Sequence, residues 1–398
     1  MTQKKKGYLR LLTPPDNLGS LVRSIRRLRI NSIRHILSIV ILVILGLCGT
    51  LLLMQNQTYG KARTSDQYPS NTTDSSRFER FADGVVRYNR DGVTFLNKKN
   101  EEIWMQPTQL QNPSIVVKEK AFVVADSGGN NILVFSEEGL KGEIETTLPI
   151  EKVAVSSQGI VAAVLHGDGD PQIVCYDAAG NILAELDTTV TGNGYPLDIS
   201  LSENGQLLLV SYMTVQNGRT VSNIYYYNFG EAGAQAENYE VLTDTYEDVI
   251  APTAFFMDGD TSAVVGNDRV LIYRGQDTPS LQNTIELDKQ IKSAFYSPSY
   301  IGLVLKNEGE AGYELRLYNK SGSMVMSEKF TGEYSNVKIC GMQVIMYGGT
   351  QCSVFTRAGI HRFEGEMDDP ILEMFPVFGV NKYIVMNANG MEVVRFVK

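Results

Sequence analysis

The chain of 398 residues carries 36 Lys and Arg against 45 Asp and Glu, a net charge of −9, and contains three His and four Cys. An acidic balance argues against a nucleic-acid-binding protein, because phosphate binding needs clustered basic side chains. Four cysteines, none in Cys-x-x-Cys spacing, argue against a disulfide-built scaffold and a thiolate metal site.

The charge is unevenly distributed along the chain. Residues 1–35 carry nine Lys and Arg and one Asp, a net of +8, which leaves −17 for residues 36–398. Within this basic tail, apolar residues recur at helical spacing over Asn17–Arg34 and predict an amphipathic helix. Such a helix suits the anionic inner leaflet of a bilayer, and a docking helix for a cytoplasmic partner is the alternative.

Residues 36–54 read ILSIVILVILGLCGTLLLM, which is 19 residues without a charge. As a helix this segment is about 28 Å long, enough to cross a hydrocarbon core. No small-x-small cleavage site follows closely, and Leu47 precedes Cys48 where a lipoprotein signal needs a small residue. We therefore expect an uncleaved transmembrane signal anchor, with residues 1–35 in the cytoplasm because basic flanks stay inside.

Residues 55–76 are polar and poor in aliphatic side chains, which predicts a flexible linker. Residues 77–398 are predicted to form an extracytoplasmic domain of strands. A short sequence motif, a run of apolar residues that ends in an aromatic residue, recurs there eight times. Successive copies start roughly 37 to 51 residues apart, which is the period of a propeller blade. The copies are Val93–Phe95, Ile132–Phe135, Ile173–Tyr176, Ile224–Tyr227, Val270–Tyr273, Leu315–Tyr318, Cys352–Phe355 and Val393–Phe396.

One unit, Ile150–Asp187, shows four predicted strands. A continuously apolar second strand, Ile160–Leu165, precedes the third strand, which carries the repeated motif. The fold class is therefore all-β, a β-propeller with eight blades favoured and seven the alternative. The chain ends after a third strand, and we expect Phe78–Phe81 to supply the missing fourth strand and close the ring.

No catalytic or metal-binding signature is present in the sequence. The three His, at positions 35, 166 and 361, give no HExxH motif, and there is no G-x-S-x-G elbow or phosphate loop. Asp168-Gly-Asp170 and Asp258-Gly-Asp260 lack the pattern of a calcium loop and are interpreted as turns. We expect no cofactor. A Cys340–Cys352 disulfide would have to join two strands that we expect a third strand to separate.

A candidate binding face follows from propeller topology. Loops that join second to third strands share a face with the connections between blades. The long loops are His166–Pro171, Thr214–Ser222 and Asn307–Gly312, and two polar connections are Thr191–Pro196 and Asp244–Asp248. Loops carry binding residues more often than the scaffold does. The predicted binding residues are His166, Asp168, Asp170, Tyr195, Arg219, Asp244, Tyr246, Glu247 and Asp248.

Two resemblances to known families are also present. Gly84–Trp104 resembles one blade of a quinoprotein-like propeller, but Trp104 is the only tryptophan, so no quinone site is carried over. Over most of its length the chain resembles an uncharacterised family, a domain of unknown function in single-pass, propeller-like membrane proteins of clostridial-type Gram-positive bacteria. The matching stretches are Asn112-Pro113, Leu148–Ile150, Gly159–Leu165, Gly194–Pro196, Tyr227–Gly230 and Ile291–Tyr296. This resemblance implies topology and fold but no activity.

Three functions are compatible with these observations. The favoured one is a non-enzymatic interaction or scaffold module that binds another envelope or membrane protein. The second is a protein that binds or hydrolyses an envelope glycan or peptide, with Asp168, Asp170 and Asp248 in proton transfer. The third is a ligand sensor coupled to the cytoplasmic helix.

Overall fold

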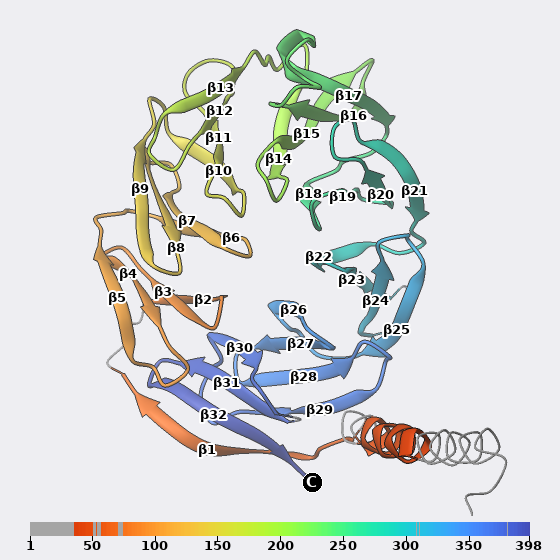
Figure 1. Cartoon of the computed structure of the whole chain (residues 1–398). Helices are drawn as coiled ribbons and strands as arrows, with labels where there is room; N and C mark the ends of the chain where they lie inside the picture. The colour runs from red at the N-terminus through yellow and green to blue at the C-terminus, as the bar shows by residue number, and fades with distance from the viewer. Residues whose placement is uncertain are drawn as a thin grey trace, which may run out of the picture. The chain divides into compact units, whose positions relative to one another are not determined.

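The computed structural model describes residues 36–50, 53, 57–70 and 75–398, apart from 308, 310 and 380. The chain forms two compact units, Met1–Gln57 and Thr58–Lys398. In the first unit residues 36–50 are helical (Figure 1). Within the part that the structure describes, no helix is long and apolar enough to span a membrane. The predicted amphipathic helix at Asn17–Arg34 lies outside the described residues.

Over its described residues, the second unit forms eight antiparallel sheets of four strands each, and each sheet is one blade. Blades 1 to 4 comprise, in order, β2 (Arg77–Phe81), β3 (Gly84–Tyr88), β4 (Gly92–Leu96) and β5 (Glu102–Pro107); β6 (Pro113–Val117), β7 (Ala121–Asp126), β8 (Asn131–Ser136) and β9 (Gly139–Glu145); β10 (Ile150–Val155), β11 (Val161–Leu165), β12 (Gln172–Tyr176) and β13 (Ile182–Leu186); β14 (Tyr195–Leu201), β15 (Leu207–Gln216), β16 (Arg219–Asn228) and β17 (Glu240–Glu247).

Blades 5 to 8 comprise β18 (Thr253–Phe256), β19 (Thr261–Val265), β20 (Arg269–Arg274) and β21 (Ser280–Glu286); β22 (Ile291–Ser297), β23 (Tyr300–Lys306), β24 (Tyr313–Asn319) and β25 (Met324–Phe330); β26 (Asn336–Cys340), β27 (Gln343–Gly348), β28 (Gln351–Thr356) and β29 (His361–Glu366); β30 (Glu373–Pro376), β31 (Lys382–Asn387), β32 (Gly390–Val397) and β1 (Lys61–Pro69). A 3-10 turn, η1 (Glu237–Tyr239), precedes β17.

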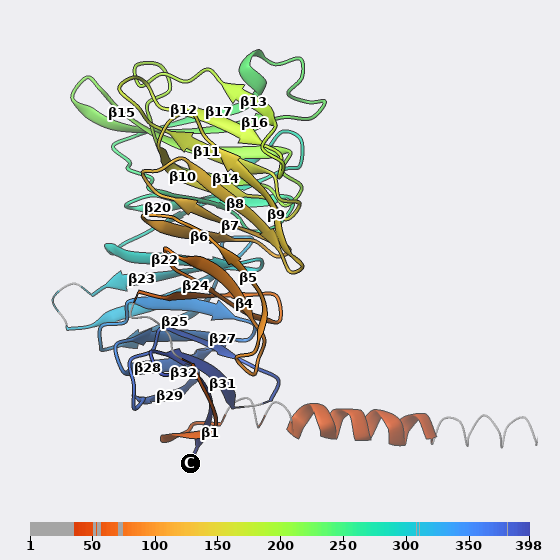
Figure 2. The same ribbon diagram turned by 90° about the vertical axis from the view of Figure 1, so that its left-hand side faces the viewer.

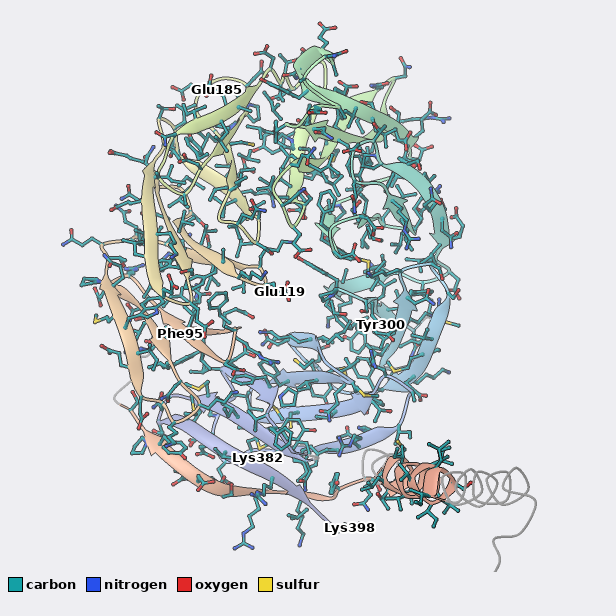
Figure 3. All side chains as sticks on the ribbon, in the orientation of Figure 1. Phe95, Glu119, Glu185, Tyr300, Lys382 and Lys398 are labelled. Atoms are coloured by element: carbon teal, nitrogen blue, oxygen red, sulfur yellow. The ribbon has the colours of Figure 1, made fainter. Side chains whose placement is uncertain are left out.

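The blades form a ring with their first strands around the centre (Figure 1). Neighbouring blades pack through the apolar second and third strands, such as β7 and β11, whose residues are all buried. All eight copies of the repeated sequence motif lie on third strands: β4, β8, β12, β16, β20, β24, β28 and β32. The propeller prediction is confirmed, and the count is eight blades. Side chains fill the spaces between adjacent blades (Figure 3).

The predicted closure of the ring is wrong. β1, not Phe78–Phe81, completes blade 8, and it pairs antiparallel with β32 from Lys61 opposite Val397 to Pro69 opposite Gly390. Phe78 and Phe81 lie on β2, the innermost strand of blade 1, where both side chains are buried. The strand β1 removes the free edge of β32.

The linker prediction for residues 55–76 is also corrected, because β1 occupies residues 61–69 of it. As the outermost strand of its blade, β1 touches the sheet on one side only. Its side chains alternate between half-buried, as at Ala62 and Thr64, and exposed, as at Lys61 and Arg63. A polar strand of this kind is compositionally close to a linker, which explains the error.

The cysteines lie as the sequence predicts. Cys340 on β26 and Cys352 on β28 are separated by β27, and both are free and buried. Burial raises the pKa of the thiols of Cys340 and Cys352 to about 11 and about 12. Protonated, buried thiols behave as small apolar groups in a core.

Candidate functional site

The propeller has two faces that follow from its strand directions. The loop face carries the loops between second and third strands and the connections between blades. The opposite face carries the remaining hairpin loops. β1 begins opposite Val397, at the end of β32, so the chain enters the ring on the opposite face. In Figure 2 the β15–β16 hairpin projects from the loop face.

A hollow of about 490 Å³ lies at blade 3 on the loop face. Its walls are the β11–β12 loop, the ends of β12 and β13, and the connection from blade 3 to blade 4. Four carboxylates line it: Asp168, Asp170, Glu185 and Asp187. None of the described residues lining it is Lys or Arg, so every charged side chain in the lining is acidic. Thr188, Thr189 and Asn193 add neutral hydrogen-bonding groups.

Hydrogen bonds hold the two loops of this acidic hollow together. Asp170 accepts a bond from the backbone N–H of Val190 at 3.0 Å, and the Thr188 hydroxyl donates to the Pro171 carbonyl at 2.8 Å. The Asn223 side chain of blade 4 donates to the Asn193 carbonyl at 3.0 Å. The walls are therefore fixed from both sides before any ligand arrives.

Gly194 makes the close approach of this connection to blade 4 feasible. Its φ is +106°, and a Cβ there would lie 2.7 Å from the Met213 carbonyl oxygen. Any other residue would meet both backbone strain and a steric clash.

His166 and Tyr195 lie beside the hollow. Their rings meet edge to face with centroids 5.9 Å apart. The Tyr195 hydroxyl donates to Glu151 at 2.5 Å. Burial, together with the hydrogen bond to Glu151, raises the pKa of Tyr195 to about 12, so the phenol stays protonated. The structure thus brings these two predicted residues together.

Arg219, Glu247 and Asp248 form a second group on the loop face. Arg219 lies 3.5 Å from a carboxylate oxygen of each acidic partner, and all three side chains are exposed. The predicted loops at Thr214–Ser222 and Asp244–Asp248 are corrected here, because β15 and β16 continue to a two-residue turn and β17 extends through Glu247. The turn is Asn217-Gly218, with φ of 52° and 79°, a sequence that favours a tight hairpin.

Asp244 and Tyr246 belong to neither group, although both lie on β17, which also carries Glu247. The Tyr246 hydroxyl is 2.8 Å from that of Tyr273 in blade 5, so this half-buried side chain joins two blades. Asp244 is half-buried and pairs in register with Ile224. The nine predicted residues therefore divide among the acidic hollow with its His166–Tyr195 rim, the Arg219 group and β17, instead of forming one cluster.

Glu151, Glu185 and Asp187 were not predicted from the sequence. Glu185 and Asp187 lie at the end of the outermost strand of blade 3, where strand polarity alone gives no functional signal. Across the described residues, no group of three or more His, Cys, Asp and Glu has the geometry of a metal site.

Comparison of the chain with known protein families identifies the family to which it belongs. The model of a "Family of unknown function (DUF5711)" matches residues 55–396. The chain belongs to this family. Because the match starts before β1, the DUF5711 unit includes the strand that closes the ring. No curated protein matches the chain in sequence.

The DUF5711 propeller is similar in structure to BamB from Moraxella catarrhalis. The TM-score is 0.50 at 12% sequence identity, covering 85% of this chain and 99% of the BamB chain. At this identity the similarity concerns the fold alone. It agrees with an eight-bladed ring and does not assign a role to any side chain.

Proposed function

We propose that this DUF5711 protein is a scaffold module of the bacterial cell envelope, anchored in the membrane, whose extracytoplasmic propeller binds a protein partner through the acidic hollow on its loop face. The hollow is the observation that carries the proposal. It is rigidly walled, has four carboxylates and no cation among its described lining residues, and lies on the face opposite the incoming chain.

The membrane anchor is proposed from residues 36–54. This segment has no charged residue, and its described helical part exposes large apolar side chains, with Ile36 62% and Leu42 71% exposed. Apolar surface of this extent is stable in a bilayer and costly in water. The basic tail of residues 1–35 supports a cytoplasmic N-terminus, with the propeller outside.

The partner is expected to present a Lys- or Arg-bearing segment. Four carboxylates around one hollow repel each other, and a cationic side chain relieves that repulsion when it enters. A fixed pocket with one charge sign favours selective binding, because an acidic partner would be rejected.

A protein-binding role fits the carboxylate positions better than hydrolysis does. Asp168 and Asp170 line the hollow, whereas Asp248 lies beside Arg219 and is not one of the lining residues. The three carboxylates considered for proton transfer therefore do not share one site. An envelope glycan is the second candidate ligand, favoured by Thr188, Thr189 and Asn193 in the hollow with Tyr195 at its rim.

The proposal is tested by affinity isolation of the full chain from native membranes. We expect Asp168→Asn with Asp187→Asn to reduce capture of a stoichiometric envelope protein, and the loss to resemble that caused by raising salt. A matched control, Glu231→Gln with Asp277→Asn, changes net charge equally in exposed loops of the opposite face. Equal capture by both variants and the native chain would contradict the assigned site. Binding of purified wall glycan, abolished only by the first variant, would favour the second candidate.

A further inference from the structure

We propose that one corner of the propeller lies against the bilayer surface, with Phe378 inserted into the interfacial layer. This closure corner comprises residues 58–60, 341–342, 357–360, 377–379, 381 and 398, all at the ends of blades 7 and 8 where the chain enters the ring. The inference rests on the proposed membrane anchor and adds the surface by which the folded domain meets lipid.

The first observation is the shortness of the tether. Tyr59 is fixed to the propeller, because its backbone N–H donates to the Arg362 carbonyl at 2.7 Å. Its ring lies 6.4 Å from that of Phe396 and 5.4 Å from the Arg362 guanidinium. Only residues 55–58 separate Tyr59 from Met54, the last apolar residue of the anchor segment. Five peptide units reach about 18 Å at most. A spanning anchor would therefore hold the closure corner within that distance of the hydrocarbon core.

The second observation is an isolated aromatic side chain at this corner. Phe378, in the β30–β31 loop, is fully exposed, with a relative accessibility of 104%. The loop is close to Tyr59, since the Phe396 N–H donates to the Asn381 carbonyl at 3.0 Å and Phe396 packs against Tyr59. Met342 in the next blade is 52% exposed, and its carbonyl accepts from the Arg357 N–H at 3.0 Å. Exposed aromatic side chains are favoured at membrane interfaces.

The third observation is a charge asymmetry on the opposite face. The charged residues of the closure corner are Arg357 and Lys398, with Lys61 and Lys382 next to it in sequence. Lys382 begins β31 opposite Arg395 of β32, and Figure 3 labels both Lys382 and the terminal Lys398 at this end of blade 8. The hairpin loops of blades 3 to 5 on this face contain no Lys or Arg and seven acidic residues: Asp177, Glu203, Glu231, Glu237, Asp258, Asp260 and Asp277. Two of these are paired with cations from outside the loops, Asp258 with Lys320 of blade 6 and Asp260 with Arg274 of β20, which leaves an excess of five acidic residues.

These observations together define a lipid-facing sector. Anionic headgroups attract the cations of blades 7 and 8 and repel the acidic loops of blades 3 to 5. The ring would therefore be held by its closure corner, with the acidic sector directed away from the membrane. Phe378 adds apolar area that water disfavours and the interface accepts.

The test uses the full chain in nanodiscs that contain phosphatidylglycerol, in a Cys48→Ala background whose remaining cysteines are buried. An environment-sensitive fluorophore is attached at Phe378→Cys, or at Val215→Cys on the loop-face hairpin as the control, where the native side chain is 68% exposed. We expect the probe at 378 to shift to shorter wavelength and to lose emission when doxyl-labelled lipid is included. The probe at 215 should show neither change and should be quenched by iodide.

The outcomes separate the two proposals. If the chain fails to enter nanodiscs, the anchor proposal fails and this inference fails with it. If the chain enters but the probe at 378 remains quenched by iodide and insensitive to doxyl lipid, the inference alone is overturned. Arg357→Gln with Lys382→Gln should weaken the doxyl quenching at 378 in anionic nanodiscs, and unchanged quenching would overturn the electrostatic part of the proposal.

Discussion

Glu373 belongs to a cluster of charged side chains that joins three blades where the ring closes. Its carboxylate, on the first strand of blade 8, lies 2.5 Å from the ammonium of Lys338 in blade 7, which is also 3.0 Å from Glu79 in blade 1. Glu373 is almost completely buried. Desolvation raises its pKa to about 7 despite the attraction of Lys338.

This raised pKa predicts a pH-dependent stability. Between the unfolded pKa of about 4.5 and the folded value of about 7, the folded state retains a proton that the unfolded state has lost. The contribution of Glu373 is therefore full below pH 4.5 and decreases as pH rises through 7. We expect the free energy of unfolding of the native chain, relative to Glu373→Gln, to fall as the pH rises from 5 to 8. Parallel stability curves for the two proteins by denaturant titration would contradict this.

Trp104 joins blades 1 and 2. Its indole stacks on Phe135 with ring centroids 5.4 Å apart, and its N–H donates to the Glu137 carbonyl at 3.0 Å. We expect Trp104→Ala to lower the free energy of unfolding by about 2–4 kcal/mol, because the stacked contact and the hydrogen bond are lost together. Ile103→Ala, on the same strand but 56% exposed, should cost less than about 1 kcal/mol. Similar losses for the two variants would show that the stacked contact is not what stabilises this pair of blades.

At the scale of elements, strands that are buried on both sides could be predicted from the sequence. Third strands such as β12 and second strands such as β11 are continuous apolar runs, so their positions and number are readable. The outermost strands could not be predicted, because β1 is polar and pairs with β32 more than 300 residues away. Two of the candidate loops are shorter than expected, because the pairing of β15 with β16 and of β16 with β17 continues beyond the apolar residues.

The closing role of β1 is testable by its register. Gln67 pairs with Glu392 across β1 and β32. In a Cys48→Ala background, Gln67→Cys with Glu392→Cys should form an intramolecular disulfide on mild oxidation, seen as a mobility shift on a non-reducing gel. Gln67→Cys with Arg395→Cys is three positions out of register and should remain reduced. Equal crosslinking of both pairs would indicate a mobile segment in place of a strand.

At the scale of the whole molecule, the ring separates two tasks. Its loop face carries the acidic hollow at blade 3, and its opposite face receives the chain at blades 7 and 8. The rigid sheets between them keep the proposed partner site away from the proposed membrane surface. The sequence predicts an anchor and a loop face, but it does not predict the acidic hollow. The grouping of Asp168, Asp170, Glu185 and Asp187 depends on the folded connection of residues 187–194.

The most direct test of a partner site in the acidic hollow is site-specific photocrosslinking of the full chain in native membranes. A photoreactive residue replaces Thr189, which is exposed at the hollow, or Ala179, which is exposed in the β12–β13 hairpin of the same blade on the opposite face. We expect a discrete crosslinked envelope protein from position 189, lost when Asp168 and Asp187 are neutralised, and none of that protein from position 179. Crosslinks of equal yield from both positions, or a product at 189 that persists without the carboxylates, would contradict the proposed site.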